Sequence, residues 1–297
     1  MSGVLTRLGQ QVTKAREMGS YRLGELLGRG GMGEVYLAHH RMLARPAAIK
    51  LIRPDALAGR DGTRAQLAAA RFRREAEAAA NLKSAHTVQL YDFGVTEDGR
   101  HYLVMELLEG INLDALVRRD GPLPAARVID ILRQVCDSLQ EAHDAGLVHR
   151  DIKPANIHLG RVGRQHDFVK VLDFGLVKSF APTTGNDSLA SVAGLALGTP
   201  AYMSPEMVHG EVVDGRSDLY SLGCVAYYLL TGHLVFEAET AIQTVLLHVQ
   251  QEPVPPSRRT ENPVPPTLDR LVLACLAKSP ADRPQSAVEL AAELTAV

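Results

Sequence analysis

The sequence lacks any apolar segment long enough to cross a membrane. No run approaches the roughly 18–20 apolar residues that a spanning helix needs, and the first twenty residues hold no apolar core of the length found in a secretory signal peptide. We therefore expect a soluble, cytoplasmic chain with no membrane segment.

An excess of positive charge and a rich supply of cysteine are also missing. The 32 basic and 34 acidic residues leave a formal net charge of −2, which argues against a general nucleic-acid or membrane-surface partner. The three cysteines, Cys136, Cys224 and Cys275, are far apart, and no CxxC pair or Cys/His cluster has metal-ligand spacing. They are expected to be buried thiols in a reducing compartment.

The apolar pattern changes near residue 110. Residues 1–20 are polar and mildly basic, with a weak helical stripe, and are interpreted as an N-terminal extension. From Tyr21 to about Tyr102 the runs are short and strand-like, except for the Ala-, Arg- and Glu-rich segment 63–80, which lacks Gly and Pro and predicts a helix. After Gly110 the periodicity is helical, and helices are expected at 113–119, 124–146, 217–231, 238–250, 267–277 and 285–295. This pattern predicts an α+β protein with a small β-rich lobe hinged to a larger helical lobe.

A glycine cluster in LGRGGMGEVY places Gly28, Gly30 and Gly33 at G-x-G-x-x-G spacing. Glycines let backbone N–H groups approach phosphate oxygens closely, but the motif alone is equally compatible with a glycine-rich hairpin turn. A dinucleotide-binding fingerprint requires a helix to begin at the last glycine. Strand-like EVYLAHH follows instead, and no GK[ST] is present, so the context favours a phosphate-covering hairpin.

Lys50 ends the apolar strand AAIK. Such a lysine is most often solvated, and one aimed at phosphates needs an anion to hold it. Helix 63–80 offers Glu75 and Glu77, which point about 200° apart around a helix. They cannot both face Lys50, and the helix alone does not choose between them.

Two segments carry catalytic residue types, HRDIKPANI at 149–157 and VLDFG at 171–175. Together with the glycine motif and Lys50 they resemble the protein kinase superfamily over residues 21–290, and within it the bacterial eukaryotic-like serine/threonine kinases. The resemblance implies a two-lobed protein kinase fold, with a small β-rich N-lobe at 21–106 that includes one regulatory helix and a mainly helical C-lobe at 107–297. Similarity of the segment RFRREA to these kinases assigns Glu75 as the partner of Lys50.

The resemblance also implies the reaction, transfer of the γ-phosphate of ATP to serine and threonine hydroxyls of protein substrates. Asp151 is expected to accept or orient the hydroxyl proton, and Lys153 to place positive charge near the γ-phosphate. Asn156 and Asp173 are expected to hold Mg²⁺, with Mn²⁺ able to substitute. The lysine at position 153 resembles serine/threonine rather than tyrosine kinases.

An adenine pocket is implied as well. Its roof, gatekeeper and hinge positions correspond to Leu27, Val35, Ala48, Met105, Glu106 and Leu108. The floor position, two residues after Asn156, is normally a medium-sized apolar residue and here is His158. The imidazole of His158 can stack flat on adenine. We expect it to affect the affinity for ATP and the pH dependence of that affinity.

Supporting contacts follow from the same resemblance. They are His149 with Phe174, Glu206 with Arg283, Asp218 with the backbone of the catalytic loop, and Thr199 with Asp151 and Lys153. Arg150 implies regulation by phosphorylation of the loop that follows Asp173, with self-association for phosphorylation in trans. The candidate acceptors are Thr183, Thr184, Ser188, Ser191 and Thr199.

The residues present disfavour two other classes of function. A pseudokinase scaffold that binds ATP without transfer usually loses the equivalents of Lys50, Asp151 or Asp173, and all three are present. A small-molecule kinase of similar fold is disfavoured by GTPAYMSPE, which resembles the peptide-binding part of protein kinases.

Overall fold

The structure is a computed structural model, and it describes residues 17–31, 33–43, 45–53, 62–174 and 200–297. The described residues form two compact units. The first unit contains the residues up to Ala76 together with Gln89–Leu107, and the second contains Glu77–Val88 together with Leu108–Val297. The expected N-terminal helical stripe lies outside the described residues.

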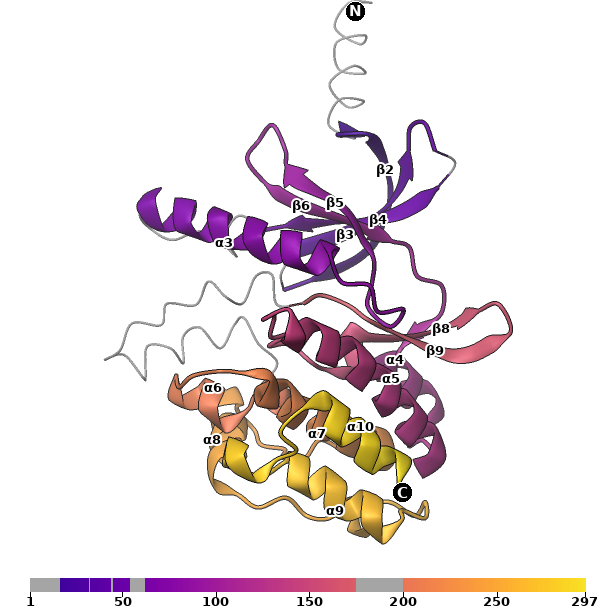
Figure 1. The fold of residues 1–297 in the computed structure, drawn as a ribbon, viewed down its shortest axis with the longest axis vertical. Helices are drawn as coiled ribbons and strands as arrows, with labels where there is room; N and C mark the ends of the chain where they lie inside the picture. The colour runs from indigo at the N-terminus through magenta and orange to yellow at the C-terminus, as the bar shows by residue number, and fades with distance from the viewer. Residues whose placement is uncertain (1–16, 32, 44, 54–61, 175–199) are drawn as a thin grey trace, which may run out of the picture. The chain divides into compact units, whose positions relative to one another are not determined.

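The first unit is built on an antiparallel six-stranded sheet in the order β1-β2-β3-β4-β6-β5 (Figure 1). Its elements are β1 (Glu17–Met18), β2 (Tyr21–Gly30), β3 (Gly33–His40), β4 (Pro46–Ile52), α3 (Gly62–Ala80), β5 (Leu90–Val95) and β6 (His101–Glu106). The short strand-like runs expected from Tyr21 to about Tyr102 and the helix expected at 63–80 are therefore confirmed. Met18, which the sequence grouped with the N-terminal extension, instead pairs with Tyr21 and is buried against the sheet.

The glycines of the β2–β3 hairpin differ in whether the surrounding atoms leave space for a side chain. A Cβ on Gly33 would lie 1.9 Å from the backbone oxygen of Leu51, so the packing of β3 on β4 excludes a side chain there. A Cβ on Gly28 or Gly30 would meet nothing within 4 Å. Gly33 is thus required by the sheet, whereas the open space at Gly28 and Gly30 leaves room for a molecule from outside.

The second unit is mainly helical. Its larger elements are α4 (Leu113–Asp120), α5 (Ala125–Asp144), α6 (Pro205–His209), α7 (Gly215–Thr231), α8 (Ala241–Gln250), α9 (Pro266–Cys275) and α10 (Ala287–Thr295). The six helices expected from the sequence are present, and α6 is additional. Every residue of α7 from Ser217 to Thr231 is buried, as expected for a central helix that is apolar on nearly all sides.

A three-stranded antiparallel sheet completes the second unit. It consists of β7 (Ile111–Asn112), β8 (Ile157–Val162) and β9 (Gln165–Val171), in that order. The sequence did not predict these strands. The 3₁₀ turn Pro154–Asn156 leads directly into β8, and β9 ends two residues before Asp173, so the β8–β9 hairpin connects the two segments that contain the expected catalytic residues and metal ligands.

The last turn of α3 and the loop after it are fixed to α5 within the second unit. The carboxylate of Glu141 accepts hydrogen bonds from the backbone N–H groups of Lys83 and Ser84, both at 2.6 Å. One turn earlier on α5, the hydroxyl of Ser138 hydrogen-bonds that of Thr87 at 2.7 Å.

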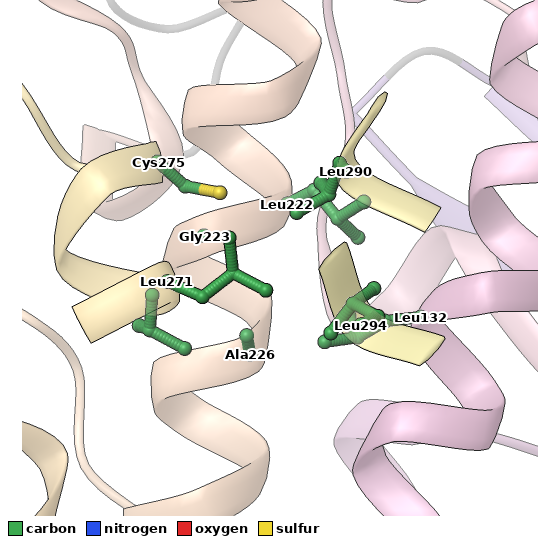
Figure 2. Close-up of a pocket in the computed structure, with 9 residues that line it drawn as sticks. Leu132, Leu222, Gly223, Ala226, Leu271, Cys275, Leu290 and Leu294 are labelled. Atoms are coloured by element: carbon green, nitrogen blue, oxygen red, sulfur yellow. The ribbon is translucent and has the colours of Figure 1, made fainter. Parts of the chain in front are cut away.

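A small cavity lies among α5, α7, α9 and α10 (Figure 2). Its volume is about 10 Å³ and its lining is apolar, with Leu222 and Ala226 from α7 and Cys275 from α9. A space of this size has room for about one water molecule, and without polar partners it stays dry. All three cysteines are free and buried, as expected. In the part of the chain that the structure describes, no helix has the length and apolarity that a bilayer crossing demands.

We predict that Gly33→Ala destabilises the protein by roughly 1–3 kcal/mol, because the new methyl group forces the backbone of Leu51 to move. Gly30→Ala is the matched control in the same hairpin, and its melting temperature should stay near that of the wild type. Thermal unfolding followed by circular dichroism makes the measurement. Equal melting temperatures for the two variants would contradict the packing argument.

Candidate active site

Lys50 lies in the middle of the first unit's sheet. It occupies β4, paired with Val35 of β3 and Leu103 of β6, and only 7% of it is exposed. Burying an ammonium group is costly unless an anion faces it. The position therefore suits a lysine that binds a negatively charged group rather than one that only ends a strand in solvent.

Glu75 and Glu77 take different environments on α3. Glu77 is exposed, whereas Glu75 is half-buried and its Oε2 atom has no hydrogen-bond partner among the described residues. A buried carboxylate oxygen without a donor costs free energy. Of the two glutamates, Glu75 is therefore the one with a buried carboxylate oxygen that receives no hydrogen bond from the described residues, which supports its assignment over Glu77.

The expected adenine-contacting residues of the first unit lie on adjacent strands. Ala48 and Met105 are direct partners across β4 and β6 and are 7% and 5% exposed. Val35 is half-buried on β3, and Leu27 on β2 is 47% exposed. Glu106 ends β6, where its carboxylate accepts a hydrogen bond from the N–H of Gln89 at 2.7 Å. Leu108 falls just past the division, in the second unit, and is half-buried.

The carboxylate of Asp151 is held by two neighbours in the second unit. Lys153 Nζ lies 2.9 Å from Oδ2, and Asn156 Nδ2 donates to the same oxygen at 3.0 Å and to the Asp151 carbonyl at 2.9 Å. Asp151 is 7% exposed. The structure thus brings Asp151, Lys153 and Asn156 together with the carboxylate fixed in one orientation, as a proton acceptor or hydroxyl-orienting group requires.

The backbone around these residues is strained at two points. Among the described non-glycine residues, positive φ angles occur at Arg150 (60°), Asp167 (52°) and Asp173 (61°). Such conformations cost about 1–3 kcal/mol each and gather at functional sites when the surroundings enforce them. Arg150 directly precedes Asp151, and Asp173 is itself an expected metal ligand.

Asp218 enforces the first of these conformations. Its buried carboxylate accepts hydrogen bonds from the N–H of His149 through Oδ2 and from the N–H of Arg150 through Oδ1, both at 2.8 Å. The expectation that Asp218 binds the backbone of the catalytic loop is confirmed.

His149 is a structural residue. The N–H of Asp151 donates to its Nδ1 at 3.2 Å, while Nε2 lies 2.8 Å from the carbonyl oxygen of Leu172. The ring packs on Phe174 with centroids 4.7 Å apart. Complete burial lowers the pKa of His149, and both nitrogens are engaged, so it does not act as a general base. The expected packing of His149 on Phe174 is confirmed.

Asn156 and Asp173 present oxygen atoms suited to a hard cation. Asn156 uses Nδ2 for Asp151, and no described residue donates a hydrogen bond to its Oδ1. Its carbonyl accepts from the N–H of Leu172 at 2.9 Å, which ties the segment before Asp173 to the catalytic loop. One amide oxygen and one carboxylate fit Mg²⁺. The described residues contain no group of three or more His, Cys, Asp or Glu that could hold a metal ion by themselves.

His158 lies on β8 opposite Asn112 and Lys170. Its neighbours along the strand, Ile157 and Leu159, point into the apolar core, so the imidazole occupies the other face and is half-buried. Burial lowers the pKa of His158. At neutral pH the imidazole ring is therefore uncharged. A neutral ring suits stacking against the flat face of adenine.

Glu206 and Arg283 form the expected buried ion pair. Arg283 Nη1 and Nη2 donate to the two carboxylate oxygens at 2.7 and 2.8 Å, and Ser217 Oγ donates to Oε1. Burial raises the pKa of Glu206, but the hydrogen bonds from Arg283 and Ser217 outweigh it, and the pKa lies below its ordinary value. This prediction from the resemblance is confirmed.

Two polar residues on the last turns of α5 were not singled out from the sequence. Glu141 anchors the loop after α3, and His143 Nε2 lies 2.8 Å from Asp218 Oδ2. A signal was present for His143, which stands on the buried face of α5, four residues after Leu139 and seven after Cys136. Glu141 lies outside that face, so the pattern gave no signal for it. Thr199 and the candidate phosphorylation sites lie outside the described residues.

Comparison with known proteins identifies the family. The protein kinase domain matches residues 21–294, and the chain belongs to this family. It is 42% identical over 278 residues to the serine/threonine-protein kinase pkn3 of Myxococcus xanthus, which covers 93% of this chain and 50% of that protein. It is 43% identical over 280 residues to the serine/threonine-protein kinase PknB of Mycolicibacterium smegmatis, covering 93% and 43%. These matches place it among the bacterial eukaryotic-like serine/threonine kinases, and the resemblance stated from the motifs is confirmed.

A solved structure supports the fold. The crystal structure of Rad53 1–466 in complex with AMP-PNP matches with a TM-score of 0.74 at 24% identity, covering 96% of this chain and 68% of that one. The predicted two-lobed kinase fold is confirmed. The chain spans about half the length of the curated kinases that it matches.

We predict that Glu206→Gln lowers the free energy of unfolding at pH 7 by about 3–5 kcal/mol, because it leaves Arg283 buried without a compensating charge. The folded-state pKa of Glu206 is depressed, so its charge stabilises the fold above the ordinary value of 4.5 and this contribution is lost as the pH falls through the folded-state pKa. The deficit of the variant should therefore shrink in acid. Urea unfolding at pH 7 and below pH 4.5 measures it, with Asp120→Asn, which disrupts an exposed ion pair with Arg119, as the control. A deficit that does not change with pH would be inconsistent with the ionised pair.

Proposed function

We propose that this chain is an active serine/threonine protein kinase domain that transfers the γ-phosphate of ATP to serine and threonine hydroxyls of proteins. The observation that carries the proposal is the arrangement of Asp151, held by Lys153 and Asn156 at the end of a strained loop. Holding a buried carboxylate in one orientation beside a strained backbone costs free energy that an exposed carboxylate would not. Such a cost is typical of catalytic positions.

The resemblance assigns nucleotide-binding residues within each unit. In the first unit, Gly28 and Gly30 leave open space in which backbone N–H groups can approach phosphates, and Lys50 supplies a nearly buried positive charge. ATP, when bound with Mg²⁺, supplies the phosphoryl group and an ion that neutralises its charge. Asn156 and Asp173 would hold that ion through their oxygens, and Mn²⁺ is proposed as a substitute.

Asp151 orients the substrate. With Oδ2 engaged by Lys153 and Asn156, the carboxylate is held in place and can accept a hydrogen bond from the hydroxyl that attacks. Lys153 bridges this carboxylate and the developing negative charge, so that proton acceptance and charge neutralisation occur side by side. Glu75, whose Oε2 lacks a partner, would stabilise Lys50 by completing an ion pair with it.

Regulation, partners and location follow from the same proposal. Arg150 would pair with a phosphorylated residue of the segment between Asp173 and Glu206, which couples activity to phosphorylation of that segment. The partners would be protein substrates and a second copy of the kinase that phosphorylates in trans, in the cytoplasm. A scaffold that binds ATP without transfer is the alternative, and the retention of Lys50, Asp151 and Asp173 disfavours it.

The test is phosphate transfer by the purified protein. We expect incorporation of label from γ-labelled ATP and Mg²⁺ into the chain or a generic protein substrate, with loss of at least about 100-fold in Asp151→Asn and Lys50→Met. Asp130→Asn, an exposed carboxylate on α5, is the matched control and should retain activity. Thermal stabilisation of the wild type by ATP without phosphate transfer would favour the scaffold. The absence of both phosphate transfer and thermal stabilisation would refute the proposal.

A second prediction concerns His158. If adenine covers the neutral imidazole, ATP binding disfavours its protonation, so affinity should fall as the pH drops through the lowered pKa of His158. His158→Leu should lose this component while retaining any pH dependence of ATP itself. Calorimetric titration of both proteins with a non-hydrolysable Mg²⁺–ATP analogue between pH 5 and pH 8 is the measurement. Parallel curves for the two proteins would show that His158 does not contact the nucleotide.

A further inference from the structure

His248 on α8 is a fully buried histidine outside the catalytic motifs. Its ring packs edge-on against the rings of Tyr220 on α7 and Phe236, with centroids 5.8 and 5.0 Å apart. Burial and the nearby charge of Lys278 lower the pKa of His248 to about 4. At pH 7 the imidazole is therefore neutral and carries one proton, on either Nδ1 or Nε2.

The phenol of Tyr220 decides which nitrogen carries that proton. Its oxygen lies 2.8 Å from Nδ1 of His248 and 3.5 Å from the carbonyl oxygen of the same residue. No other acceptor for this phenol is found among the described residues, and a contact of 2.8 Å is the better hydrogen bond. The phenol therefore donates to Nδ1, and the proton of the imidazole resides on Nε2.

The Nε2 donor of His248 lacks a satisfactory partner. The atom is buried and makes no hydrogen bond of acceptable length and angle to the described residues. An unpaired N–H in the interior costs free energy. Lys278, which lies nearby with its ammonium over the ring of Phe236, has donors only and cannot serve as the acceptor.

Ala201 offers the missing acceptor. Its backbone lies close enough to His248 to favour the protonated ring, as a carbonyl oxygen that faces an imidazole nitrogen does. Ala201 is the middle residue of the 3₁₀ turn Pro200–Tyr202, and it is buried. A small movement of this turn would complete a hydrogen bond from Nε2 to the Ala201 carbonyl.

The same turn is held from α7. The hydroxyl of Ser221, the residue after Tyr220, donates to the carbonyl of Tyr202 at 2.7 Å. Donors from two helices thus face two successive peptide units of the turn. The turn belongs to GTPAYMSPE, which resembles the peptide-binding part of protein kinases.

We infer that His248 is a positioning residue for the protein substrate: by donating from Nε2 to the carbonyl of Ala201, it fixes the turn Pro200–Tyr202 against which the substrate chain lies. The inference rests on the proposed function. Asp151 and Lys153 lie on a different loop, and Lys50 belongs to the first unit. Loss of the Nε2 donor should therefore weaken substrate binding and leave phosphate transfer at saturating substrate nearly unchanged.

The test compares two amide variants that differ by one methylene group. His248→Asn retains an acceptor near the position of Nδ1 but has no donor near that of Nε2, whereas His248→Gln is long enough to place an N–H there. With a serine- or threonine-containing peptide that the wild type phosphorylates, we expect His248→Asn to raise the KM for the peptide roughly fivefold or more. Its kcat and its KM for ATP should change by less than about twofold.

Two further variants complete the kinetic comparison. His248→Gln should keep the KM for the peptide within about twofold of the wild type, because the donor is restored. His233→Asn is the matched control, since it makes the same substitution at an exposed histidine 3.7 Å from Glu237 in the same unit. All three kinetic constants should be unchanged in it.

Two readouts do not need catalysis. Nitrogen-15 NMR of the wild type at pH 7 distinguishes the neutral tautomers, and the His248 signal, assigned by its loss in His248→Gln, should report the proton on Nε2. The backbone N–H of Met203 donates to the carbonyl of Pro200 across the turn at 3.3 Å. Its hydrogen–deuterium exchange should accelerate in His248→Asn and stay near wild type in His248→Gln.

The outcomes separate the inference from the proposed function. A wild type that transfers no phosphate refutes the function, while the tautomer and the exchange of Met203 still decide whether His248 holds the turn. A proton on Nδ1 overturns the inference, because Nε2 would then be an acceptor. An unchanged peptide KM in His248→Asn overturns it too. Equal rises in the Asn and Gln variants also overturn it, since the role would then belong to packing of the ring.

Discussion

The arrangement of the second unit depends on one buried carboxylate, that of Asp218. Burying an ionised carboxyl group is among the costlier features a domain can contain. The cost is offset because both oxygens accept short hydrogen bonds from two successive backbone N–H groups and an imidazole. Since these donors come from the loop before Asp151 and from α5, the central helix α7 determines where the loop lies.

Further contacts connect the loop held by Asp218 to the segment around Asp173. His149, held by Asp218, contacts the carbonyl of Leu172 and the ring of Phe174. The N–H of Leu172 in turn donates to the carbonyl of Asn156. Short contacts thus link the catalytic loop, which contains Asp151 and Asn156, to the segment from Leu172 to Phe174. A substitution at one of these positions is expected to shift the others.

The sequence predicted most of the larger elements because their signals are local. The absence of Gly and Pro from 63–80 and the apolar periodicity of α5 and α7 are visible without tertiary information. Strands β8 and β9, which pair with each other as neighbours in the chain, were missed because polar residues such as Arg161 and Asp167 interrupt their apolar pattern. Strand β7 was missed because it has only two residues and pairs with β8, which is distant in the chain. Met18 was missed for the same reason, since a two-residue strand has no periodicity of its own.

The candidate site was predictable to the extent that its residues stand in motifs. Asp151, Lys153 and Asn156 were named from HRDIKPANI, and the structure brings them together. The helix alone did not choose between Glu75 and Glu77. Similarity of the segment RFRREA to the kinases did, and the burial of Glu75 supports that choice. The role of Gly33 as a packing residue, distinct from Gly28 and Gly30, depends on the distance to Leu51. The contact of His143 with Asp218 joins two elements that lie far apart in the chain, so the sequence could not show it.

The burial of all three cysteines has a consequence for chemical modification. The thiolate is the reactive form, and burial raises the pKa of Cys275 to about 12 and those of Cys136 and Cys224 further still. Oxidants and electrophilic reagents therefore find almost no thiolate to attack in the folded chain. A single cysteine introduced on an exposed strand or helix would be the one reactive thiol of the folded protein. Fluorophores or spin labels could then be attached at a chosen point without removing any native cysteine.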